Sequence, residues 1–137
     1  MEYKTDIRVY YEDTDAGGIV YHSNFLNFCE RARCEMLRDF GYEASKIEKD
    51  LGLMFVIKHA DIEYIAPGKL DDALEVLTTV AEMKNTSFKM NHTIQKDGNA
   101  LCKILITVVS VDVKSIKPVR LPDILRTKFE PYLERNS

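Results

Sequence analysis

The sequence of 137 residues is poor in cysteine, and it lacks both a long apolar run and an excess of positive charge. Its three cysteines, Cys29, Cys34 and Cys102, are odd in number and have no metal-ligand spacing. They indicate reduced, mostly buried thiols in a cytoplasmic protein without a metal site. No apolar segment approaches the roughly 18–20 residues of a transmembrane helix, and the first residues contain no apolar stretch typical of a secretory signal.

The net charge of -3 argues against nucleic acid as the main partner. Charge is nevertheless uneven, because residues 114–128, "KSIKPVRLPDILRTK", contain five basic side chains and one acid. We call this segment the basic cluster. Two interpretations stay open for it, a surface that binds an anionic ligand and an ordinary solvated segment.

The length and the hydrophobic content of 45% fit one domain over residues 1–137. Alternation over residues 5–11 predicts a strand in which Ile7, Val9 and Tyr11 point inward. Apolar residues spaced three or four apart then predict a helix up to Phe40. Ser23 or Asn24 is expected to cap this helix, and Gly41 to end it.

The rest of the chain is predicted to be mainly strands. Asp97-Gly98 is a strong hairpin signal, and the last strand is apolar on both sides, as in a strand that is covered on both faces. The fold class is therefore α+β, with one main helix on a sheet whose other face needs a partner, most simply a second copy of the chain. The predicted segments are a short helix at 43–50, strands at 54–65, 73–82, 87–96 and 100–113, and a helix at 122–134.

A crowded loop, "YYEDTDAGGIVYHSNF", lies between the first strand and the long helix. Glycines let backbone approach a ligand, and a helix start offers unpaired N–H groups with a partial positive charge. A carboxylate beside such a helix start would form an acyl-transfer site, with a nucleophile or base and an oxyanion hole. A plain capping loop with solvated acids is the alternative that these residues leave open.

Residues 9–37, "VYYEDTDAGGIVYHSNFLNFCERARCEML", closely resemble the signature of the YbgC-type acyl-CoA thioesterases. These belong to the 4-hydroxybenzoyl-CoA thioesterase branch of the hotdog-fold superfamily. "EYIAPGKLDD" at 63–72 and "KNTSF" at 84–88 match as well. The resemblance implies a hotdog fold, in which a five-stranded antiparallel sheet wraps around one long helix. It also implies homodimers, often paired into homotetramers, and no metal.

The resemblance assigns roles to individual residues. Asp15 matches the catalytic carboxylate, a nucleophile or general base, and His22 matches the helix-start position whose N–H polarises the thioester carbonyl and whose side chain is also considered catalytic. Tyr11 matches a tyrosine named with these two, although a core aromatic is an equal alternative. Gly17 and Gly18 shape the loop and support the oxyanion site.

Three further residues are interpreted more modestly. Asp13 matches the first acid of the motif and is expected to make capping or turn hydrogen bonds. Lys84 loosely resembles a position where a relative contacts coenzyme A phosphate, and a solvated lysine is the simpler interpretation. His92 lies on the apolar face of its strand and is expected to be a core or interface residue.

The function predicted on this basis is hydrolysis of acyl-CoA to free acid and CoA, without a cofactor beyond the substrate. A hotdog dehydratase acting on acyl thioesters and a non-catalytic acyl-CoA or protein-binding module are the alternatives. The expected setting is the cytoplasm, with cell-envelope or lipid-synthesis proteins as partners that the resemblance suggests. The acyl group and the choice between covalent and general-base hydrolysis are left open by the sequence.

Overall fold

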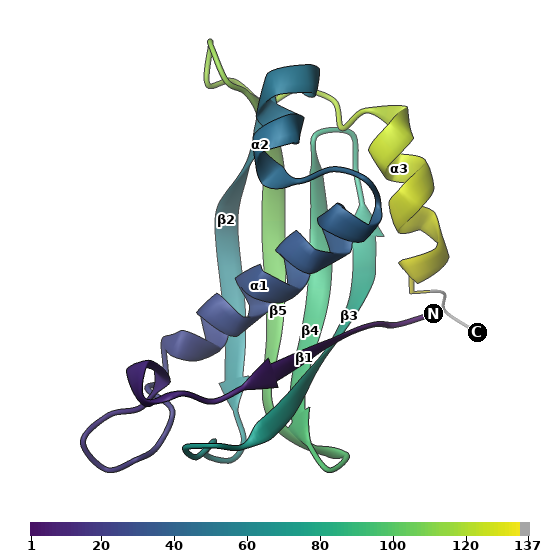
Figure 1. Cartoon of the computed structure of the whole chain (residues 1–137). Helices are drawn as coiled ribbons and strands as arrows, with labels where there is room; N and C mark the ends of the chain where they lie inside the picture. Colours follow the sequence, from purple (N-terminus) through teal and green to yellow (C-terminus); the bar gives the residue numbers. More distant parts are fainter. Residues whose placement is uncertain (135–137) are drawn as a thin grey trace.

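The computed structural model describes residues 1–134 and has the predicted α+β architecture (Figure 1). All strands pair antiparallel in one five-stranded sheet, in the order β1-β3-β4-β5-β2. The long helix α1, Asn24–Asp39, crosses one face of this sheet. The strands are β1 (Tyr3–Arg8), β2 (Leu53–Tyr64), β3 (Ala73–Met83), β4 (Ser87–Lys96) and β5 (Asn99–Asp112).

Helix α1 forms where apolar side chains recur every three or four residues, and those side chains are buried against the sheet. Its end at Asp39 is followed by Gly41 at φ +92°, a conformation that glycine adopts without a steric penalty. The predicted side-chain cap is wrong. Ser23 occupies the cap position without a capping hydrogen bond, and the Asn24 amide is directed to another group described below.

The shorter helices follow the predicted segments closely. Residues 43–50 contain α2 (Ala44–Lys46), which continues into the π-helical turn η2 (Ile47–Leu51). At the C-terminal side, α3 covers Asp123–Phe129, and a 3-10 turn, η3 (Glu130–Tyr132), replaces the expected last helical turn. Pro131 lies in this turn and has no N–H to continue a helix.

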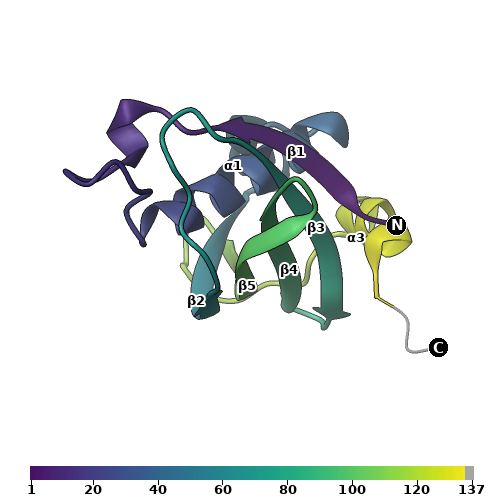
Figure 2. The ribbon, with the colours of Figure 1, turned by 90° about the horizontal axis from the view of Figure 1, so that it is seen from below.

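Strands β3, β4 and β5 alternate between buried and half-buried residues, with the buried set facing α1. The predicted hairpin at Asp97-Gly98 is confirmed, because both residues have positive φ, +51° and +82°. Helix α3 lies on the same face as α1, since Phe129 packs against Phe40 and Phe88 (Figure 2). The outer face of β5 is therefore only half-buried within one chain, and its predicted covering by a second copy stays a prediction.

Strand β2 forms one edge of the sheet and pairs only with β5 among the described strands. Its register shifts between Ile57 and His59, and most of its side chains are exposed, including Val56 and Tyr64. An edge strand of 12 residues leaves a long row of backbone groups open to another chain. Within residues 1–134, no helix is long and apolar enough to cross a membrane.

Candidate active site

The crowded loop begins where strand β1 stops pairing. Arg8, opposite Ala73, is the last paired residue, and the chain then turns through the 3-10 turn η1, Tyr11–Asp13. Val9 stays buried, but the side chain of Tyr11 is 81% exposed. The prediction that Tyr11 points inward with Ile7 and Val9 is therefore wrong, because strand alternation does not continue into the turn.

Asp13 is the buried centre of this loop. Its carboxylate accepts hydrogen bonds from the Tyr10 N–H at 2.9 Å and from the Asn24 side-chain amide at 2.6 Å. Arg31, two turns further into α1, lies 3.9 Å from the same carboxylate. Asp13 thus ties the end of β1 to the start of α1, which is the structural role expected for it.

Asp15 lies at the base of a small hairpin, which is closed by a bridge between Thr14 and Val20. Its backbone N–H donates to the Ile19 carbonyl at 2.9 Å. Its side-chain Oδ1 accepts from the N–H groups of Gly17 at 2.9 Å and Ile19 at 3.3 Å. The carboxylate is thereby oriented through one oxygen, and Oδ2 has no hydrogen-bond partner within residues 1–134. The residue is exposed, so Oδ2 is accessible to a ligand.

Glycines allow this hairpin to close tightly. Gly18 has φ +77°, and a Cβ at Gly17 would approach Oδ1 of Asp15 to 3.3 Å. The hairpin is held against the segment before β3 by the Val20 N–H, which donates to the Gly68 carbonyl at 2.8 Å. A Cβ at Gly68 would come within 2.9 Å of Val20, so this approach requires glycine.

His22 is exposed and lies just before α1, with its ring 4.5 Å from that of Tyr21. Its carbonyl accepts a hydrogen bond of 3.1 Å from the hydroxyl of Tyr64, at the far end of β2. The two rings are also 6.1 Å apart in an edge-to-face arrangement. Tyr64 was not predicted as a site residue, because the contact joins positions 42 apart; its presence in the matching "EYIAPGKLDD" segment was the available signal.

The start of α1 has unpaired backbone donors. The N–H groups of His22, Ser23 and Phe25 have no acceptor within the described chain, whereas the Asn24 N–H donates to the Tyr21 carbonyl at 2.8 Å. No acid lies in the first turn, and Ser23 does not cap it. These N–H groups are therefore not capped by a side chain, and with the positive end of the helix dipole they can stabilise negative charge on an oxygen.

The structure does not bring every predicted residue together. Lys84 lies in the β3–β4 turn, 3.6 Å from Glu82, whereas the loop packs beside Lys69 and Asp72 before β3 begins. The 11 residues of β3 separate these two ends by roughly 35 Å. The basic cluster lies at the Lys84 end, where Arg126 donates to the Lys84 carbonyl at 2.6 Å. Within one chain, neither Lys84 nor Arg126 can contact a ligand at His22.

Two basic residues of the cluster have structural roles. Arg120 donates to Asn85 and forms an ion pair with Asp123, and Arg126 donates to the carbonyls of Leu121, Lys84 and Asn85. Lys114, Lys117 and Lys128 are exposed. Across residues 1–134 there is also no group of three or more His, Cys, Asp or Glu side chains suited to hold a metal ion.

Comparison with known proteins gives a consistent picture. The family model described as the thioesterase-like superfamily matches residues 9–129. An acyl-CoA thioesterase YbgC from Haemophilus influenzae is 40% identical over 123 residues, which cover 90% of each chain. An acyl-CoA thioester hydrolase YbgC from Escherichia coli is also 40% identical, over 93% of this chain and 96% of its own.

Solved structures extend the likeness to three dimensions. A probable thioesterase from Bartonella henselae superposes with a TM-score of 0.85 at 30% identity, over 89% of this chain and all of its own. A gentisyl-coenzyme A thioesterase superposes with a TM-score of 0.83 at 26% identity, over 92% of this chain and 98% of its own. The predicted fold is thus confirmed both by the sheet topology and by related structures.

Proposed function

Since the chain belongs to the thioesterase-like superfamily, and within it to the YbgC-type acyl-CoA thioesterases, we propose that Asp15 and the start of α1 together carry out the hydrolysis of the thioester. The observation that carries this proposal is the pair of complementary groups in one loop. Asp15 offers an accessible carboxylate oxygen, and the N–H groups at His22 and Ser23 lack an acceptor within residues 1–134.

The start of α1 stabilises the negative charge that develops on the thioester carbonyl oxygen. When water or a carboxylate attacks the thioester carbon, the carbonyl oxygen becomes an oxyanion. The N–H of His22, at the positive end of α1, then donates to it, and Tyr64 fixes the peptide of His22 through its carbonyl. Removing one such donor typically costs about 3–4 kcal/mol of transition-state stabilisation.

Asp15 supplies oxygen to the carbonyl carbon by one of two routes. As a general base, it takes a proton from water while the water oxygen attacks, and the tetrahedral intermediate expels CoA thiolate. As a nucleophile, it forms a mixed anhydride with release of CoA thiolate, and water then hydrolyses the anhydride. A thiol with a pKa of about 8.5 is a good leaving group, so little acid assistance is needed at sulfur.

We also propose that the working form is a homo-oligomer in which β2 edges meet. Val56 and Ile57 are exposed on this long edge, and Tyr64 lies at its end beside His22. A partner copy would therefore lie close to the site. The Lys84 and basic cluster of that partner copy, which are distant from His22 within one chain, would then contact the CoA phosphates of a substrate bound at His22. A cytoplasmic location, and cell-envelope or lipid-synthesis proteins as partners, remain proposals that the family suggests.

The test is thiol release from a panel of acyl-CoA substrates by the wild-type protein and by Asp15→Asn. Asparagine keeps Oδ1 as an acceptor for Gly17 and Ile19, so the hairpin is retained while the charge is removed. We expect kcat to fall at least about 100-fold with substrate binding intact. A 3-hydroxyacyl thioester that becomes unsaturated without thiol release would instead indicate a dehydratase, and tight binding without any turnover would indicate a binding module.

A further inference from the structure

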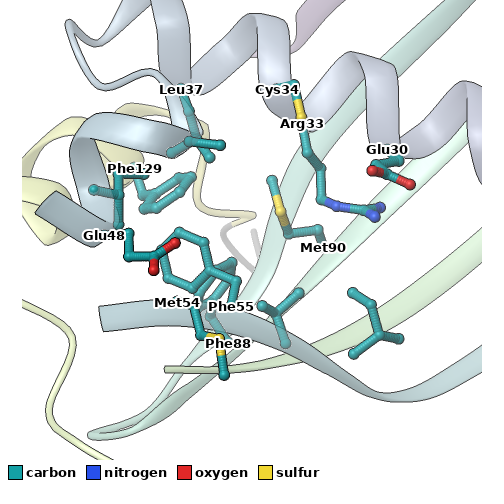
Figure 3. A pocket seen from close by; sticks show the side chains of 14 residues that line it. Glu30, Arg33, Cys34, Leu37, Glu48, Met54, Phe55, Phe88, Met90 and Phe129 are labelled. Carbon is teal, nitrogen blue, oxygen red and sulfur yellow. The ribbon is translucent and has the colours of Figure 1, made fainter. Parts of the chain in front are cut away.

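A cavity of about 400 Å³ lies between α1, the α2–η2 segment and the inner face of the sheet (Figure 3). Its wall is mainly apolar and includes Leu37, Met54, Phe55, Phe88, Met90 and Phe129. Ile57 from the exposed β2 edge also lines it, so the mouth opens toward that edge. Nothing in the proposed hydrolytic step uses this cavity.

One strongly polar side chain interrupts the apolar wall. The guanidinium of Arg33 lies beside Met90 in the cavity (Figure 3). Its Nη1 is 3.2 Å from Nε2 of His92. Nδ1 of His92 is 2.9 Å from the Thr78 hydroxyl. Because arginine can only donate, Nε2 is the acceptor, and the His92 proton lies on Nδ1, facing Thr78. Burial, with a further contribution from Arg33, lowers the pKa of His92 to about 3, so the ring is neutral.

The positive charge of Arg33 is thus not balanced by His92. No carboxylate oxygen lies within 4.0 Å of its nitrogens among residues 1–134. Burial lowers the pKa of Arg33, because removing the cation from water costs solvation free energy. A guanidinium has five N–H donors, and His92 uses one. The remaining donors can bind oxygen on a ligand inside the cavity.

The rim shows which kind of oxygen fits. Glu30 and Glu48 are exposed and line the mouth. The negative charge of Glu30, one turn earlier on α1, favours the charged form of Arg33. A negatively charged ligand group that enters past these two carboxylates is repelled by them. A neutral hydroxyl or carbonyl oxygen is not, and it still accepts hydrogen bonds from the guanidinium.

We infer that this cavity holds the distal part of the acyl chain, and that Arg33 selects chains with a neutral hydroxyl or keto oxygen far from the thioester. This inference rests on the proposed function, because it places the thioester carbonyl at the start of α1. The Arg33 guanidinium lies near the level of Glu30, six residues after Asn24, or about 9 Å along the helix. An extended chain of eight carbons spans such a distance.

The experiment compares octanoyl-CoA, 8-hydroxyoctanoyl-CoA and the eight-carbon ω-carboxyl analogue as substrates. We expect the wild-type protein to favour the hydroxyl chain in kcat/KM. Arg33→Met should reduce the ratio of hydroxyl to plain substrate at least tenfold by acting on the hydroxyl chain alone. Arg38→Met is the matched control, since Arg38 is an exposed arginine of the same helix that pairs with Glu35 and is absent from the cavity wall.

Each outcome has a defined meaning. Equal wild-type rates for the plain and hydroxyl chains, a preference for the ω-carboxyl chain, or an equal loss on both chains in a folded Arg33→Met protein would overturn the inference. Should that variant not fold, the wild-type preference alone decides. Binding of the same three thioesters is also measured by calorimetry, which does not need turnover. A protein that hydrolyses none of them but binds the hydroxyl chain best refutes the proposed hydrolysis while supporting the cavity assignment.

Discussion

The side-chain amide of Asn24, the first residue of α1, donates to the buried carboxylate of Asp13 at 2.6 Å. The second oxygen of that carboxylate accepts from the Tyr10 N–H at the end of the β1 segment. One acid therefore sets the distance and direction between the strand end and the helix start. The hairpin with Asp15 and the unpaired N–H groups of the helix both depend on this connection.

Replacing this acid tests its structural role. In Asp13→Asn, one carboxylate oxygen becomes an NH2 group that faces a donor, either the Asn24 amide or the Tyr10 N–H. We expect the free energy of unfolding to fall by about 1–3 kcal/mol, the typical cost of a buried group without its partner. Urea unfolding measures this, with the exposed neighbour Glu12→Gln as control. A normal midpoint for Asp13→Asn would contradict the assignment.

Much of this fold could be predicted because its signals are local. The three-and-four spacing of Phe25, Phe28, Cys29 and Ala32 predicts α1, and Asp97-Gly98 predicts its hairpin. The sequence could not show where β1 ends, since the alternation runs on past Arg8, the last residue paired in the ladder, and past Val9, the last residue that bonds to the segment before β3. The alternation therefore predicts an inward Tyr11, whereas the side chain is exposed.

The candidate site was predictable in part for the same reason. Asp15, the glycines and His22 lie within one continuous stretch whose resemblance to a known signature is visible. The hydrogen bond from Tyr64 and the Arg33–His92 contact join segments 42 and 59 positions apart. Such pairs depend on the register of β2 and β4 against α1, which no local pattern encodes. The position of Lys84 far from His22 likewise follows only from the direction of β3.

His92 should make the protein sensitive to acid. Its pKa is lowered to about 3 by burial and by Arg33, whereas an unfolded histidine titrates near 6.5. Between these values the unfolded state binds a proton that the folded state does not. The free energy of unfolding therefore falls as pH decreases from about 6.5, by up to about 1.4 kcal/mol per pH unit. Urea unfolding at several pH values should show a flatter profile for His92→Gln, but an unchanged one for the exposed His59→Gln.

The assembly can be tested directly. The helices cover one face of the sheet, and the β2 edge is long and exposed, so we expect a homodimer or homotetramer in sedimentation at micromolar concentration. Val56→Asp places a charge on that edge and should shift the equilibrium toward smaller species. A monomer mass for the wild-type protein would refute the shared edge, and with it a site near a partner chain.

The basic cluster leads to a kinetic prediction. Neutralising Lys84, or the exposed Lys117, should raise KM more than it lowers kcat, since uniform binding of the CoA phosphates is lost. The effect should shrink at high salt, where charges are screened. Steady-state kinetics test this, with the exposed Lys4→Gln on β1 as a matched control. Arg126→Gln is unsuitable, because this side chain holds three backbone carbonyls. An unchanged KM for both lysine variants would place the phosphates elsewhere.

The last prediction separates the roles of Asp15 and His22. His22→Ala removes the imidazole but keeps the backbone N–H and the carbonyl that Tyr64 binds. If the N–H is the oxyanion donor, as we propose, kcat should fall much less than the roughly 100-fold loss expected for Asp15→Asn.

A double variant, Asp15→Asn with His22→Ala, makes this comparison quantitative. Independent roles give losses that add as free energies, whereas an imidazole that orients water for Asp15 gives two large single losses that do not add. Tyr64→Phe serves as the positioning control, because it removes the hydroxyl that holds the His22 peptide and should lower kcat while leaving both groups in place. Near-normal turnover in a folded Asp15→Asn protein would exclude this loop as the catalytic site.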